Sequence, residues 1–411
     1  MKSRYDIAIV GGGMVGATLA ALLGQANFNV ALIEAGPAEV RWSKDSIAPR
    51  VSALTAASQR LFDSLGVWDS IVAKRVSAYF GVQVWDAEGT GEIHFSADEI
   101  GSTDLGHVVE NDAILDSLRA YLATLSNVEL IYDNHVTALS VSPLSNGDSE
   151  CLLTLSDFPQ VASSLVVAAD GARSPLRRLM GIEVNEWDTN QSAIVTTVHH
   201  EKVHSGITRQ AFLSTGPLAF LPLDSDDGHC SSIVWSADQP EADRLMALSD
   251  ERFAQAMGAA FEDRLGAVSK VSPRHRFPLV QRHAVDYVKP GFALVGDAAH
   301  GIHPLAGQGV NLGFLDVAVL AETLIHARSR GVSLGNVQML SRYARQRRAD
   351  NAMMLNAMAA FCRGFGSQNP WVRLARNVGL RRVHQCMPIK RMLIRQALGG
   401  RTGLPTRMRQ A

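Results

Sequence analysis

The chain has 411 residues, 46% hydrophobic and 19% charged, so it can bury a sizeable core and form two or three domains. This composition excludes a disordered chain. Four scattered cysteines, without CxxC or metal spacing, indicate reduced thiols and no metal site, which suits a cytoplasmic protein. The net charge is −1, and all 40 acidic residues fall within positions 1–350, which argues against nucleic-acid binding.

The first segment has the pattern of a dinucleotide-binding unit. A strand at 7–10 precedes GxGxxG, then an Ala/Leu helix, a strand from Val30 to Ile33 and an acid. The glycines allow a tight turn, a pyrophosphate and close helix packing, and the acid suits an unphosphorylated adenosine ribose, hence FAD or NAD. We expect contacts from Gly11, Gly13, Met14, Val15, Gly16, Glu34 and Ala35.

Residues 7–33 carry no charge, so a membrane span is an alternative for this segment. Its glycines, together with Gln25, Asn27 and Asn29, would be poorly accommodated in lipid. We therefore favour the strand, helix and strand interpretation.

A second strand that ends in an acid lies in the middle of the chain. Residues 165–169 are apolar, and Asp170 and Gly171 follow them. Ser174 and Pro175 suit the N-cap and first position of a short helix, so part of this motif has a local structural reason. Its place between two flavin-like segments nevertheless makes Asp170 a candidate cofactor residue.

The most informative stretch is GDAAHGIHPLAGQGVNLG, residues 296–313. An apolar strand at 292–295 ends at Gly296, so Asp297 should project from the carboxyl end of that strand, where open α/β sheets bind ligands. A carboxylate there can accept hydrogen bonds from polyol hydroxyls.

A turn and a helix follow within the same stretch. After Pro304, Gly307 and Gly309 would let the backbone approach a ligand closely. Val310 and Asn311 begin a helix, whose first amides favour electron-rich atoms such as those of a reduced flavin.

Two other parts of the chain have their own patterns. Residues 75–100 and 190–282 contain β-branched and aromatic runs typical of strands, which we expect to form a sheet over the flavin, backed by a helix near 244–265. Residues 351–411 hold eleven basic and no acidic residues, interspersed with apolar ones. This tail could lie on an anionic membrane, dock on an acidic partner, or pack on the acidic body of the same chain.

The order GxGxxG, DG and GD resembles that of the group A flavoprotein hydroxylases, aromatic monooxygenases with one FAD-binding domain, and the resemblance spans nearly the whole chain. RVSAL at 50–54, VVEN at 108–111 and HPLAGQGVNLG at 303–313 are similar to the ubiquinone-biosynthesis hydroxylase family. Local likenesses point both to its C5 and to its C6 hydroxylases. Ala48, where an acid is frequent, and Gly301, where threonine is usual, depart from the pattern.

The resemblance implies an α/β fold like that of p-hydroxybenzoate hydroxylase. A Rossmann-like FAD-binding domain (1–74, 101–189 and 283–350) would interleave with a β-sheet substrate domain (75–100 and 190–282), and 351–411 would form a helical tail. It also implies that Arg50 and Asn111 lie near the pyrophosphate or ribityl chain, and that the backbone of Val136 contacts adenine.

The implied reaction is hydroxylation of a polyprenylated phenol or benzoquinol with O2, through a flavin C4a-hydroperoxide. NAD(P)H or another donor would bind transiently, because the chain has no second GxGxxG. No catalytic base can be chosen, and His300 and His303 suit structural hydrogen bonding better. The alternatives are another chemistry on this fold, such as an isoprenoid reductase or a halogenase, and a noncatalytic flavin subunit of a quinone-synthesis complex.

Overall fold

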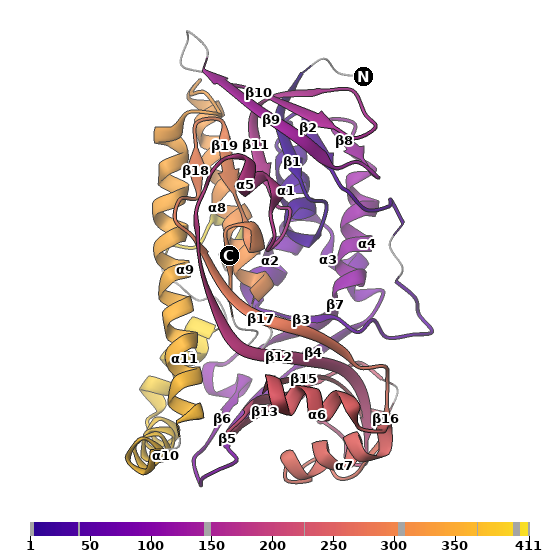
Figure 1. The fold of residues 1–411 in the computed structure, drawn as a ribbon, viewed down its shortest axis with the longest axis vertical. Helices are drawn as coiled ribbons and strands as arrows, with labels where there is room; N and C mark the ends of the chain where they lie inside the picture. Colours follow the sequence, from indigo (N-terminus) through magenta and orange to yellow (C-terminus); the bar gives the residue numbers. More distant parts are fainter. Residues whose placement is uncertain are drawn as a thin grey trace.

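The structure is a computed structural model that describes residues 4–39, 42–143, 149–225, 227–302, 309–367, 369–397 and 403–409. Figure 1 shows two main sheets, one near the N-terminus and one at the opposite end, joined by the long strands β12 (Val184–His200) and β17 (His275–Ala284).

The first sheet is mainly parallel. Its central strands run in the order β19-β11-β1-β2-β8, the antiparallel β9 and β10 extend it beside β11, and β18 pairs with β19. Both faces of β1 are buried from position 7 to position 10, which explains the unbroken apolar sequence there. The strands are β1 (Tyr5–Val10), β2 (Val30–Ile33), β8 (Val128–Ile131), β9 (Val136–Pro143), β10 (Ser149–Leu155), β11 (Val161–Ala168), β18 (Val288–Lys289) and β19 (Phe292–Leu294).

Helices cover this sheet. Helix α1 packs against α4 and α8, and α8 packs against α9. The uncharged stretch at 7–33 is thus β1, α1 and β2, as expected. The covering helices are α1 (Met14–Gln25), α2 (Ala56–Leu65), α3 (Trp68–Val72), α4 (Asn111–Leu122), α5 (Pro175–Leu179), α8 (Gly309–Ser329) and α9 (Val337–Gly366).

Helix α8 is the one described helix that is long and apolar enough to cross a membrane. However, 67% of its most apolar window is buried inside the protein, so it serves here as a core helix.

The second sheet is mostly antiparallel, in the order β20-β17-β12-β15-β14-β13-β5-β6, with β16 beside β12. Helices α6 (Gln239–Ala247) and α7 (Asp250–Ala260) back it and bury Leu245, Phe253 and Met257 in a separate core. They replace the single helix expected at 244–265, because the chain breaks at Leu248. The other strands are β5 (Gly81–Asp86), β6 (Glu92–Ser96), β13 (Ile207–Leu213), β14 (Gly216–Pro222), β15 (Cys230–Asp238), β16 (Val268–Val271) and β20 (His300–Gly301).

A small third sheet, β3-β7-β4, lies between the two. It comprises β3 (Val51–Leu54), β4 (Val76–Tyr79) and β7 (Gly106–Glu110). Strand β4, which sequence reasoning grouped with the substrate segment 75–100, therefore belongs to neither main sheet. Short 3-10 turns are η1 (Ala97–Ile100), η2 (Gly296–Ala298) and η4 (Thr406–Met408).

The C-terminal segment is helical. Helix α9 runs unbroken through position 350, where we expected the tail to begin, and α10 (Pro370–Gln385) and α11 (Met387–Ala397) follow. Arg376 pairs with Asp86 at 2.6 Å, and Lys390 pairs with Glu99 at 2.5 Å. The tail is therefore anchored on the strand β5 and turn η1 side of the second sheet, beside which Figure 1 shows it.

Candidate active site

A cavity of about 550 Å³ lies between the two main sheets. One side is formed by the start of α1, the β3 and α4 region, the turn η2 and the start of α8. Strands β12, β14, β15 and β17 of the second sheet form the other side. The predicted residues that line it are Gly13, Met14, Val15, Arg50, Asn111, Asp297, Gly309 and Val310.

The β1–α1 turn shows why its glycines are needed. Gly11 has a φ of +105°, and a Cβ there would lie 2.2 Å from the carbonyl oxygen of Ala169. A Cβ on Gly16 would lie 1.9 Å from the carbonyl oxygen of Gly11, whereas Gly13 has open space around it. Thus Gly11 and Gly16 permit close packing, and Gly13 faces the cavity at the start of α1. The first turn of α1 has no acidic side chain, so its free amides suit an anion.

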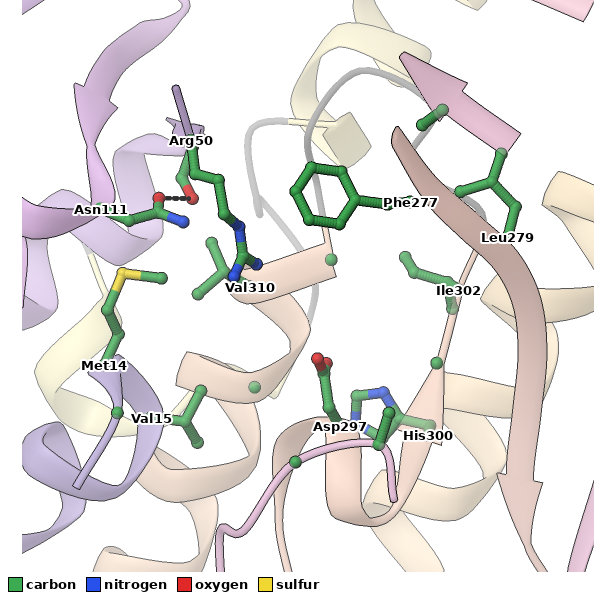
Figure 2. A pocket seen from close by; sticks show the side chains of 18 of the residues that line it. Met14, Val15, Arg50, Asn111, Phe277, Leu279, Asp297, His300, Ile302 and Val310 are labelled. Atoms are coloured by element: carbon green, nitrogen blue, oxygen red, sulfur yellow. Dashed lines mark hydrogen bonds between the residues drawn. The ribbon is translucent and has the colours of Figure 1, made fainter. Parts of the chain in front are cut away.

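Arg50 and Asn111 lie on one side of the cavity, across from Phe277 (Figure 2). The Asn111 Oδ1 atom accepts a hydrogen bond from the Ser52 hydroxyl at 2.6 Å, and the Arg50 guanidinium lies 5.9 Å from the centre of the Phe277 ring. The backbone carbonyl of Arg50 accepts from the Asn111 amide at 3.0 Å. The Ser52 hydroxyl therefore fixes the Asn111 side chain at the cavity wall, and the Asn111 amide fixes the backbone of Arg50, whose side chain is exposed.

Glu110 holds the segment that carries Arg50. Its buried carboxylate accepts hydrogen bonds from the Ala48 amide at 2.5 Å and the Trp42 indole at 3.3 Å, and it pairs with Arg75 at 2.6 Å. The sequence flagged Ala48 as a departure from the family pattern. In this chain the backbone amide of Ala48 makes the contact with Glu110.

Asp297 projects into the cavity from η2, as the sequence predicted (Figure 2). No described residue hydrogen-bonds its carboxylate. The carboxylate is exposed to the cavity, but the protein that encloses the cavity reduces its hydration, and this desolvation raises the pKa of Asp297 even though His300 and Arg50 favour its ionised form. An unpaired carboxylate at this place can accept hydrogen bonds from the hydroxyls of a ligand.

Behind Asp297 lies a buried ionic network. His300, which also lines the cavity, contacts the Asp316 carboxylate through Nε2 at 2.5 Å, and Arg347 donates to the same carboxylate through Nε at 2.8 Å. The amide of Gly296 donates to it at 3.0 Å. Burial alone would raise the pKa of Asp316, but His300 and Arg347 outweigh it and hold that pKa at about 2. These contacts agree with the expectation that His300 serves as a structural hydrogen-bonding residue.

The first turn of α8 approaches the cavity through Gly309 and Val310. Asn311 does not line it. Its side chain accepts from the Ser58 hydroxyl at 2.7 Å and donates to the Ala53 carbonyl at 2.8 Å, so it ties α8 to the β3–α2 segment. Only the backbone amide of Asn311 remains for a ligand. Pro304, Gly307 and His303 lie outside the described residues.

Several other predicted residues do not line this cavity. The Glu34 carboxylate accepts hydrogen bonds from the backbone amides of Gly12 at 2.5 Å and Gly36 at 2.8 Å. Its expected contact with the adenosine ribose stays a prediction. One carboxylate oxygen of Asp170 accepts a hydrogen bond from the Leu176 amide at 3.1 Å, which supports a local structural role at the start of the short helix α5. The other oxygen is buried without a partner. The remaining ones, whose contacts also stay predictions, are Gly11, Gly16, Ala35, Val136 and Gly296.

The side facing the flavin elements is largely apolar. Its aliphatic and aromatic residues include Val195, Leu221, Val234, Phe277 and Leu279. Sequence reasoning expected strands of a sheet here but assigned none of these side chains to the cavity, because the side to which each points depends on strand register. The period-two alternation of β15 would have been the only available signal.

The residues present fit FAD. The open α1 amides suit its pyrophosphate, the unpaired Asp297 carboxylate suits its ribityl hydroxyls, and the α8 amides suit the electron-rich edge of its ring system. A dinucleotide-binding sheet that shares one cavity with a largely apolar antiparallel sheet defines a flavoprotein with a single FAD-binding domain.

Comparison with known proteins agrees with the assignment of an FAD site. The FAD binding domain family matches residues 4–357, and the chain belongs to this family. It is 39% identical over 396 residues to the 3-demethoxyubiquinol 3-hydroxylase of Escherichia coli K12, covering 96% of this chain and 98% of the relative. It is 34% identical over 433 residues to the human ubiquinone biosynthesis monooxygenase COQ6, covering 95% and 92%. The chain is thus an FAD-dependent monooxygenase, as the sequence predicted.

Solved structures confirm the fold. The p-nitrophenol 4-monooxygenase PnpA of Pseudomonas putida DLL-E4 superposes with a TM-score of 0.78 at 21% identity, covering 98% of this chain and 100% of that one. A ternary complex of aklavinone-11 hydroxylase with FAD and aklavinone has a TM-score of 0.68 at 18% identity, covering 88% and 70%.

Proposed function

We propose that this chain hydroxylates the ring of a polyprenylated phenol or benzoquinol in ubiquinone biosynthesis. The observation that carries the proposal is the cavity, which has flavin-binding elements on one side and an apolar sheet on the other. The names of the relatives support the substrate class, since they include a 3-demethoxyubiquinol 3-hydroxylase and a ubiquinone hydroxylase, UbiL, of Rhodospirillum rubrum at 38% identity.

FAD, when bound, supplies the activation of O2 for ring hydroxylation. The chain's own residues position and shield the reactants. Asp297 and the first amides of α8 would hold the cofactor, and Arg50 and Asn111 would orient it from the other side. Phe277, Leu279 and their apolar neighbours would keep water from the ring and favour an apolar aromatic substrate over a polar one. NAD(P)H or another donor would deliver electrons in a transient encounter.

Complementation tests this proposal without isolating the electron donor. The chain would be expressed in Escherichia coli strains that each lack one of the cell's own ubiquinone ring hydroxylases. We expect one strain to regain ubiquinone, and its identity would give the ring position. Failure in every strain, with FAD-loaded protein present, would contradict the proposed substrate.

A second proposal concerns location. Helices α10 and α11 expose several apolar side chains, of which we call five the tail patch: Trp371, Leu374, Val378, Met392 and Leu393. These apolar side chains are exposed, Trp371 to 78%, and the exposed Arg382 and Arg391 lie in the same helices. Exposed apolar groups beside cations suit an anionic membrane surface. We therefore expect a cytoplasmic protein that binds peripherally to the inner membrane, where a polyprenylated substrate would reside; another quinone-synthesis protein is the alternative occupant of this surface.

A further inference from the structure

Ser232 is a buried polar residue on the largely apolar side of the cavity. It lies on β15, lines the cavity and is 0% exposed. Its hydroxyl has no hydrogen-bond partner. Among the side chains of the described residues that are buried and unpartnered, it is the one that belongs to the cavity lining.

The strand geometry gives the direction in which Ser232 points. Side chains alternate between the two faces of a strand, and Val234, two residues further on, also lines the cavity. The neighbouring Ser231 points to the other face, where its hydroxyl lies 2.9 Å from Nε2 of His200. In the adjacent strand β14, the residue in register with Ser232 is Leu221, another lining residue.

The surroundings of Ser232 define what it can recognise. Its partners in register are Leu221 on β14, 1% exposed, and Thr197 on β12, 5% exposed, so this is the closed end of the cavity. Leu221 cannot hydrogen-bond the hydroxyl, and no hydrogen bond joins it to Thr197. A buried hydroxyl without a partner costs free energy in the free protein. A ligand oxygen that reaches it removes this cost, whereas a plain hydrocarbon does not, so such a group discriminates between ligands.

We propose that Ser232 is a specificity-determining residue that hydrogen-bonds an oxygen substituent of the substrate ring at the closed end of the cavity. This inference rests on the proposed function, because it takes the ligand to be an oxygenated aromatic ring. Ser232 selects that ring against a hydrocarbon of the same shape, and the apolar residues around it accept either.

Binding calorimetry on the flavin-loaded protein, without reductant, tests this with two probes: 2-geranylphenol and geranylbenzene, which lacks the oxygen. The wild type should bind the phenol more tightly. Ser232→Ala should weaken phenol binding about three- to tenfold, the worth of one hydrogen bond, and leave geranylbenzene binding unchanged. Ser232→Cys, with a weak thiol donor, should lose most of the same preference.

Ser231→Ala is the matched control, since it removes a paired hydroxyl from the opposite face of the same strand. It should lower the melting temperature and keep the preference for the phenol, whereas Ser232→Ala should not lower the melting temperature. An unchanged phenol preference in Ser232→Ala would overturn the role of Ser232 alone. Failure of the wild type to bind 2-geranylphenol would overturn the proposed substrate class as well.

Discussion

At the scale of single residues, Asp297 has the clearest conflict between stability and function. Its carboxylate faces the cavity with no hydrogen-bond partner among the described residues, and desolvation raises its pKa. Such a group destabilises the free protein when ionised and becomes useful only when a ligand donates to it. This is typical of a binding residue.

We predict that Asp297→Ala weakens FAD binding about 10-fold or more, because hydrogen bonds to a charged group contribute about 1.5–3 kcal/mol. Fluorescence titration of the flavin-free protein with FAD would measure the dissociation constant. Asp157→Ala, which removes an exposed carboxylate that does not line the cavity, is the control. An unchanged FAD affinity in Asp297→Ala would show that the cofactor is placed incorrectly.

A second prediction concerns pH. Since the folded-state pKa of Asp297 is raised, its ionisation disfavours folding above that pKa, and this penalty disappears as the pH falls below the ordinary carboxyl value. Asp297→Asn should therefore raise the melting temperature of the flavin-free protein at neutral pH, and the gain should shrink in acid. Thermal unfolding across pH would measure it. A gain that did not depend on pH would rule out this electrostatic origin.

Sequence reasoning reached Asp297 because it follows the end of an apolar strand, a position visible in one dimension, whereas Arg50 and Asn111 were expected only from the resemblance to the family. It did not reach Ser232 or Phe277, since the sheet register that turns them toward the cavity comes from pairing between distant strands. The side-chain contacts of Glu34 and Asn311 were also beyond it, because their partners depend on the local folded geometry.

At the scale of elements, the buried network around Asp316 joins η2, β20, α8 and α9. Arg347 and Asn351 reach Asp316 from α9, while His300 and the Gly296 amide reach it from the turn that carries Asp297. The position of Asp297 is therefore coupled to the packing of two long helices. No local sequence motif indicated this, because Asp316 and Arg347 are 31 residues apart.

We predict that Arg347→Met lowers the free energy of unfolding by about 3–5 kcal/mol, because it leaves the buried Asp316 carboxylate without its guanidinium partner. Urea unfolding would measure the loss. Arg348→Met, an exposed neighbour in the same helix, should change it by no more than about 0.5 kcal/mol. Adding Asp316→Asn to Arg347→Met should restore part of the loss, and additive losses would contradict the coupling.

The Asp316 network also makes stability depend on acid. With a folded-state pKa of about 2 against an ordinary 3.8, ionised Asp316 stabilises the fold fully above the ordinary value, and this contribution is lost as the pH falls from about 4 toward 2.

At the scale of the whole molecule, the interleaved architecture was expected from the resemblance to the group A hydroxylases, which rests on the chain order of GxGxxG, DG and GD. In the structure these three motifs follow β1, β11 and β19, which are neighbouring strands of one parallel sheet. The arrangement of the tail was not predictable, because a basic, partly apolar segment suits a membrane surface, an acidic partner and the acidic body of the same chain equally well. The ion pairs of Arg376 and Lys390 support packing on the same chain, and the tail patch still remains exposed.

We predict that Trp371→Ser together with Leu374→Ser lowers partition onto phosphatidylglycerol-containing vesicles severalfold and leaves the melting temperature unchanged, since both side chains are exposed. Cosedimentation would measure this partition. Val203→Ser, an exposed apolar residue outside the tail, is the control. Equal partition of wild type and variant would contradict membrane binding through the tail patch.

The central claim is that this chain uses FAD to place one oxygen atom on a polyprenylated ring. The most direct measurement supplies the FAD-loaded protein with a prenylated phenol, a reductant and ¹⁸O2, followed by mass spectrometry of the ring. We predict one ¹⁸O atom at a single ring position. Flavin reoxidation that yields labelled hydrogen peroxide and an unlabelled ring would contradict the account.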